Sequence, residues 1–172
     1  MSIKMNDKRT MLVHFLAALA YRTQKALRGA PEYFADYRAG NDARTPRELI
    51  RHMASVLGYS RTFFTGGTYR AEPLATFADE VERFHEMLGN LKELLASGTP
   101  LIDISEERML QGPFSDAMTH AGQIAMLRRL EGTPVPSENF ILASIDPANL
   151  TLEQPEPAAP DLNWPNKPDH EK

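Results

Sequence analysis

The chain of 172 residues contains no cysteine, which excludes disulfide bonds, a thiol nucleophile and thiolate metal ligands. It also lacks any apolar run near the roughly 20 residues that a membrane-spanning helix needs. Residues 1–9 are polar and do not form the apolar core of a signal peptide. We therefore expect a cytoplasmic protein with no membrane partner.

The chain also lacks a strong excess of either acidic or basic residues, with 23 Asp and Glu against 19 Lys and Arg. The formal net charge is −4, and no dense run of Lys and Arg, of the kind that follows a phosphate backbone, is present. Glycine-rich phosphate loops and the G-x-S-x-G motif of serine hydrolases are missing. These absences predict that the protein has no nucleic-acid partner, and they exclude two common designs of enzyme active site.

Apolar residues recur at helical spacing in four long segments, and no segment shows the alternation that is typical of a strand. The chain is long enough to bury one core without covalent cross-links. The sequence therefore predicts an all-α fold, a four-helix bundle, with helices over about 10–28, 45–64, 76–96 and 112–130.

Two of these helices carry start signals. Thr45 is a predicted N-cap, and Glu48 completes a capping box with it. Pro113 suits the first position of the helix over 112–130, because its missing N–H would have no partner there. Residues 105–107 start either a separate turn or a kinked lead-in to that helix.

The remaining segments are shorter. Residues 31–44 are predicted to form a connector with one helical turn, and residues 137–145 to form a short extra helix. We place a single domain over 1–150 and an extended tail over 151–172, with Trp164 as the one plausible anchor of the tail. Five prolines in this tail argue against regular structure: Pro155, Pro157, Pro160, Pro165 and Pro168.

The helix over 112–130 carries an unusual polar group. At 100° per residue, Asp116, His120 and Gln123 share one stripe with two leucines. One interpretation is a buried Asp–His hydrogen bond in which the carboxylate selects the imidazole tautomer. The other is a pair of metal ligands, which requires a third ligand from another helix.

The metal-site interpretation depends on whether another histidine can supply the third ligand. His14 lies on the polar side of its predicted helix and is expected to be solvated, and His85 lies at the boundary of an apolar stripe. His52 and Tyr59 fall inside the apolar stripe of the helix over 45–64. An imidazole buried without a partner costs on the order of 1–3 kcal/mol, so His52 needs a partner.

If the second and fourth helices are neighbours, His52 meets Asp116 and His120 in one pocket. Two imidazoles and one carboxylate form a facial set that leaves coordination positions open, whereas a closed structural zinc site needs a fourth protein ligand. Gln123 is a candidate for orienting a ligand, and Tyr59 a candidate hydrogen-bond donor to substrate. A plain packing role remains an equal alternative for both.

The sequences TPRELIRHM at 45–53 and DAMTHAGQIAMLRRL at 116–130 resemble the DinB-like four-helix bundle family, also called the DinB/YfiT superfamily. The resemblance covers about 10–144. Members of that family usually bind a divalent metal through one histidine on the second helix and an H-x-x-x-H pair on the fourth. His52 and His120 match two of these positions, and Asp116 stands where the family has its middle histidine.

The resemblance implies a divalent metal ion, either Zn, Ni, Fe or Mn. It also implies a small-molecule substrate or a thiol, because family members with an assigned activity resemble metal-dependent S-transferases of low-molecular-weight thiols, or hydrolases. A non-catalytic helical bundle that binds a metal or another ligand is the alternative. A homodimer is expected in either case.

Overall fold

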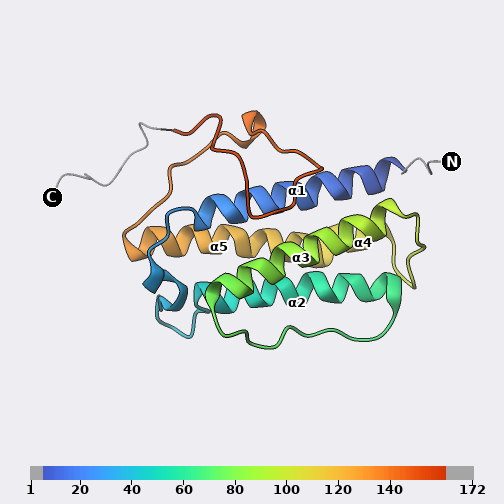
Figure 1. Ribbon diagram of the computed structural model, residues 1–172, viewed down its shortest axis with the longest axis horizontal. Coiled ribbons are helices and arrows are strands. Elements are labelled where there is room, and N and C mark those ends of the chain that lie inside the picture. Colours follow the sequence, from blue (N-terminus) through green and yellow to red (C-terminus); the bar gives the residue numbers. More distant parts are fainter. Residues whose placement is uncertain (1–5, 162–172) are drawn as a thin grey trace.

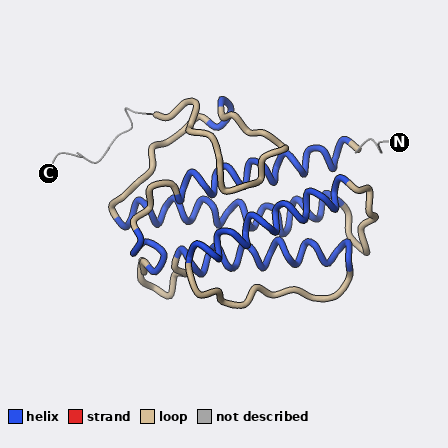
Figure 2. The backbone as a smooth tube through the Cα atoms, viewed as in Figure 1, coloured by secondary structure: helices blue, strands red, loops and turns tan. Residues whose placement is uncertain are grey.

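The computed structural model describes residues 6–161, which form an all-α fold (Figure 1). No strand occurs within this range, as Figure 2 shows, so the predicted all-α class is confirmed. The four long helices are α1 (Asp7–Leu27), α2 (Pro46–Thr65), α3 (Phe77–Ala96) and α5 (Ser115–Glu131). Shorter elements are the turn Glu32–Asp36, the helix α4 (Glu106–Met109) and the turn Phe140–Leu142.

The four long helices lie side by side, and α1 and α5 run opposite to α2 and α3 (Figure 1). Each helix has two neighbours, because α1 packs on α5 and α3, and α2 packs on α3 and α5. The apolar stripes meet between them in one core, whose fully buried members include Leu16, Leu19, Ile50, Met53, Leu57, Phe84, Leu88, Leu91, Phe114 and Ile124.

Because α2 and α3 run in the same direction, the loop 66–76 must return along the length of α2 (Figure 1). Gly58 allows this loop to approach, since a Cβ atom at that position would lie 2.0 Å from the ring of Tyr69. The N–H of Ala71 donates to Ser55 Oγ at 3.0 Å. The loop is therefore held against the outer side of α2.

The helix starts follow the predicted rules where the signal is local. Thr45 caps α2, and the Glu48 carboxylate accepts from the N–H of Thr45 at 2.8 Å, so the capping box is confirmed. Thr76 and Asp79 form a second capping box at the start of α3. These caps satisfy N–H groups that have no partner inside the helix.

The start of the last long helix differs from the prediction. Pro113 does not occupy the first helical position, because it lies in a π turn, Leu110–Phe114, that joins α4 to α5. The alternative of a kinked lead-in is therefore correct. A proline lacks the N–H that a regular helical turn uses, and a local widening of the helix accommodates it. The hydroxyl of Ser115 donates to the carbonyl of Leu110 at 2.6 Å across this turn.

The segment after α5 contains less helix than expected. Residues 137–145 include only the short turn Phe140–Leu142, and the chain then passes over α1 (Figure 1). It contacts α3 through the carbonyls of Ala148 and Leu150. Leu150 is buried against the body, and Arg28 donates to the carbonyl of Gln154 at 2.8 Å. The predicted anchor Trp164 lies outside the described residues. Within 6–161, no helix is long and apolar enough to cross a membrane.

Candidate metal centre

Two neighbouring helices bring His52, Asp116 and His120 together. His52 projects from α2, and the other two side chains project from α5 one turn apart. The His120 side chain is 9% exposed, His52 is 31% exposed and Asp116 is 48% exposed. The group therefore lies at the edge of the helix interface, with its carboxylate open to solvent.

The distances in this group are long for hydrogen bonds. Nε2 of His52 lies 3.5 Å from Oδ2 of Asp116, and Nε2 of His120 lies 3.4 Å from Oδ1. An N–H···O hydrogen bond typically spans about 2.7–3.2 Å. Two ligands that each lie about 2.0–2.2 Å from one ion are separated by roughly 2.8–3.6 Å, depending on the coordination geometry. Both separations are longer than a good Asp–His hydrogen bond and lie within the range of two ligands around one ion.

The two imidazoles also converge on each other. Their ring centroids lie 4.7 Å apart with the planes at 82°, and one ligand atom from each of the three residues lies within 4.8 Å of the others. With one ligand atom from each residue, the donor set is two nitrogens and one carboxylate oxygen, a set that zinc and several other divalent metals accept.

Gln123 selects the tautomer of His120. Oε1 of Gln123 lies 2.7 Å from Nδ1 of His120, and because an amide oxygen can only accept, Nδ1 must donate its proton. In a neutral ring this leaves the lone pair on Nε2, which is the nitrogen that faces Asp116. A side chain that holds the second nitrogen of a ligand histidine in this way is a recurring feature of metal sites.

The environment of His52 favours its neutral form. Burial lowers the pKa of this imidazole most, the neighbouring Arg44 and His120 side chains lower it further, and Asp116 acts in the opposite direction. A neutral imidazole keeps the lone pair that metal coordination requires.

Tyr59 does not lie in the core as its place in the apolar stripe predicted. It is 51% exposed, its ring packs on Phe63 at 4.7 Å, and it borders an open hollow of about 580 Å³ that Asp116 and Thr119 also line. The π turn before α5 forms another wall of this hollow. Tyr59 and Asp116 therefore border the same open hollow.

The other two histidines have different surroundings. His14 is exposed, as predicted. His85 was predicted at a boundary, but only 7% of it is exposed, because residues 148–150 cover it and the carbonyl of Leu150 lies 2.7 Å from its Nδ1. Its burial depends on a contact 65 residues away in the sequence.

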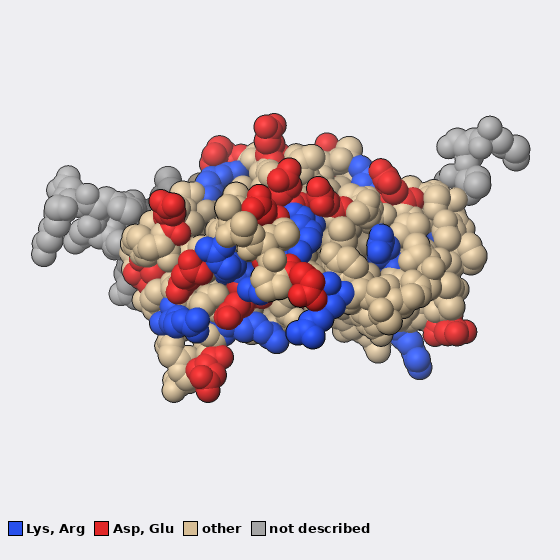
Figure 3. Space-filling view, turned by 60° about the horizontal axis from the view of Figure 1, so that its bottom comes forward, with Lys and Arg blue, Asp and Glu red and all other residues tan. Residues whose placement is uncertain are grey.

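An open cavity of about 570 Å³ has His52 in its wall and is lined by four arginines: Arg38, Arg44, Arg51 and Arg70. Sequence reasoning missed this group, since its members are widely spaced and form no basic run. On the face that carries the loop 66–76, charged side chains of both signs gather over the half toward the start of α2 (Figure 3).

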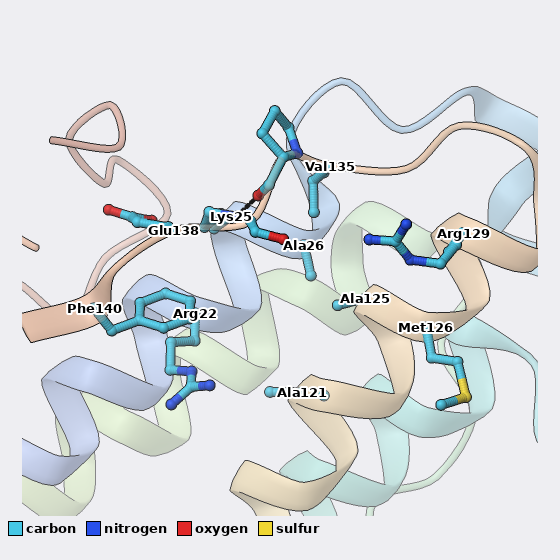
Figure 4. A pocket seen from close by; sticks show the side chains of 13 residues that line it. Arg22, Lys25, Ala26, Ala121, Ala125, Met126, Arg129, Val135, Glu138 and Phe140 are labelled. Carbon is cyan, nitrogen blue, oxygen red and sulfur yellow. Dashed lines mark hydrogen bonds between the residues drawn. The ribbon is translucent and has the colours of Figure 1, made fainter. Parts of the chain in front are cut away.

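A second cavity, of about 430 Å³, lies between α1, α5 and residues 135–140 (Figure 4). Arg22 and Lys25 line it, and the Arg22 guanidinium stacks 4.1 Å from the Phe140 ring centroid. His52, Asp116 and His120 are not among its lining residues.

Comparisons of this chain with family models, with curated proteins and with solved structures find no match. Membership of the DinB-like family therefore stays a prediction from the sequence motifs.

Proposed function

We propose that the protein binds one divalent metal ion through His52, Asp116 and His120 and uses it to act on a small molecule. The observation that supports this proposal is the pair of separations, 3.4 and 3.5 Å, between the two Asp116 oxygens and the two imidazole Nε2 atoms. Both are too long for good hydrogen bonds, and one ligand atom from each of the three residues lies within 4.8 Å of the others.

The group suits a reactive site better than a closed structural one. A structural zinc site has four protein ligands, whereas the candidate metal-binding group within residues 6–161 has three members. Asp116 is half exposed, so solvent and small molecules reach the group. When bound, the ion would lower the pKa of a coordinated thiol or water and polarise an electrophile.

The chain's own residues would orient the reactants. Gln123 keeps His120 in the tautomer whose Nε2 faces the group. Tyr59 presents its side chain at the hollow beside Asp116, where its hydroxyl is a candidate donor to a bound substrate. The resemblance to the DinB-like family favours transfer of a thiol to an electrophile, or hydrolysis, as the reaction class.

Metal titration of the purified, chelator-treated protein tests the proposal. We expect one equivalent of Zn, Ni, Fe or Mn to bind and to raise the melting temperature, because a ligand that binds only the folded state stabilises it by about 2.7 kcal/mol at a hundredfold excess over Kd. The His14→Ala variant, altered at an exposed histidine, serves as the matched control. Equal metal binding by the wild type and by His120→Ala would refute the site.

A further inference from the structure

The arginine-lined cavity adjoins the candidate metal centre through His52, which forms part of its wall. Two sides of the cavity come from segments outside the helices, one from residues 38–44 and the other from residues 70–73. The third side is α2 itself, through Arg51 and Ser55. A molecule in this cavity therefore lies beside one of the three candidate ligands.

Both non-helical walls are held in place. Asp36, next to the first wall, accepts from Arg47 with both carboxylate oxygens at 2.9 Å, so the chain before residue 38 is tied to α2. The second wall is tied down by the bond from Ala71 to Ser55 and by Arg83, which donates to the carbonyl of Glu72 at 2.6 Å. The cavity is thus shaped by specific contacts rather than by loose loops.

Glu80 completes this support. It is fully buried, and its Oε1 accepts from the N–H of Leu74 at 2.9 Å and lies 3.5 Å from Nε of Arg51. Arg83 contacts its other oxygen. One buried carboxylate therefore secures the loop and shares its charge between Arg83 and Arg51, the most buried arginine of the cavity.

The other three arginines of the cavity differ from Arg51 in their partners. Arg38, Arg44 and Arg70 are exposed, and none of them forms a hydrogen bond or ion pair with a residue in the part of the chain that the structure describes. Asp42, Glu48 and Glu72 also line the cavity, so its four arginines and three carboxylates leave a formal charge of +1. The Glu48 carboxylate accepts from a backbone N–H in the capping box.

From this arrangement we propose that the cavity binds the anionic group, a carboxylate or a phosphate, of a small organic molecule. Guanidinium groups match the planar oxygens of both anions and bind them with two parallel hydrogen bonds. A concave surface whose arginines outnumber its carboxylates also concentrates anions more than a flat one does. That this molecule is the substrate of the metal centre rests on the proposed function; that the cavity binds anions does not.

The test begins with the full-length protein after metal removal, titrated with succinate and, separately, with inorganic phosphate. We expect saturable binding of at least one probe by the wild type. The double variant Arg44→Gln/Arg70→Gln should bind it at least about tenfold more weakly, because charge-assisted hydrogen bonds are lost. Binding by only one of the two probes would identify the anion as a carboxylate or as a phosphate.

The control is Arg108→Gln, which removes an exposed arginine from α4, outside the cavity. It should change the affinity less than about twofold, since a charge beyond a Debye length of about 10 Å is largely screened. An absence of saturable binding by the wild type, or equal weakening in the control and the double variant, would overturn the anion site.

A second measurement tests the link to the metal centre. In the cobalt-loaded protein, the bound probe should alter the visible absorption spectrum of the wild type, and the double variant should need at least about tenfold more probe for the same change. Saturable anion binding with an unchanged spectrum would overturn the substrate assignment. If no metal binds at all, the proposed function fails, while the metal-free titration still decides the anion site.

Discussion

As whole residues, His120 and His85 are equally buried, each 7% exposed. Only His120, however, belongs to the candidate metal centre. Both rings have Nδ1 within 2.7 Å of an oxygen that can only accept, Oε1 of Gln123 for His120 and the carbonyl of Leu150 for His85. Both neutral rings therefore carry the proton on Nδ1 and the lone pair on Nε2.

The difference lies in what the two Nε2 atoms face. In His120 this atom faces the half-exposed carboxylate of Asp116 at 3.4 Å, with His52 beside it. In His85 it is buried and has no hydrogen-bond partner among residues 6–161, and the ring packs against Phe84 at 5.1 Å. Burial and tautomer are thus alike, and only the convergence of further donor atoms makes an imidazole a candidate ligand.

The largest expected effect comes from removing each ring in turn. His120→Ala should lower divalent-metal affinity at least about 100-fold, because even outer-shell partners of a metal ligand are worth 10- to 100-fold. His85→Ala should leave the affinity within about twofold, since this ring faces no other donor. Competition with a chromophoric chelator measures both affinities, and comparable losses in the two variants would contradict the distinction.

A second experiment alters Asp116, the carboxylate that faces His120 and has no counterpart at Nε2 of His85 within residues 6–161. Asp116→Asn keeps the size and removes the charge, so metal affinity should fall about tenfold or more if the carboxylate is a ligand. Asp116→His should retain a metal with altered preference, because it supplies a third imidazole. If Asp116 only hydrogen-bonded His120, the Asn variant would be tolerated and the bulkier His would destabilise by about 1–3 kcal/mol.

A third experiment tests the shared tautomer. Gln123→Leu removes the acceptor at Nδ1 of His120 and should weaken metal binding by about tenfold, at the lower end of the range for such partners. Gln123→Glu keeps an acceptor in the same place and should bind metal at least as well as the wild type. Isothermal titration at one pH compares the two, and equal weakening by both would contradict a tautomer-selecting role.

Local signals explain most of what the sequence predicted correctly. The capping box of Thr45 and Glu48 depends on residues three apart, and the shared face of Asp116 and His120 depends on one helical turn. Their approach to His52 required the further assumption that the second and fourth long helices are neighbours, and the structure confirms that α2 packs on α5.

Features that depend on distant contacts were not predictable from spacing. His85 is buried because residues 148–150 fold over α3, and no pattern around position 85 indicates this cover. Tyr59 lies on the same side of α2 as His52, but the π turn before α5 leaves a hollow beside it, so it is exposed. The arginine-lined cavity likewise depends on the path of the loop 66–76.

The smallest expected effect is on stability as a function of pH, and it depends on the buried ring outside the metal centre. Burial lowers the pKa of His85, against a weaker opposing effect of the Leu150 carbonyl. Between that lowered pKa and the ordinary value of about 6.5, the unfolded chain binds more protons than the folded one. The free energy of unfolding of the metal-free protein should therefore decrease as the pH falls below about 6.5.

His52 contributes a dependence of the same sign, because its pKa is also lowered, so the two histidines must be separated by substitution. His85→Gln keeps a donor for the Leu150 carbonyl and removes the titrating ring, and it should flatten the slope more than His52→Gln does. The reason is desolvation: His85 is 7% exposed, whereas the His52 side chain is 31% exposed. Urea unfolding between about pH 7.5 and 5.5, with His14→Gln as the exposed control, measures the slopes. If His85→Gln left the pH dependence of the unfolding free energy unchanged, the prediction would be wrong. Residues 148–150 would then move away from the protonated His85 ring without destabilising the fold.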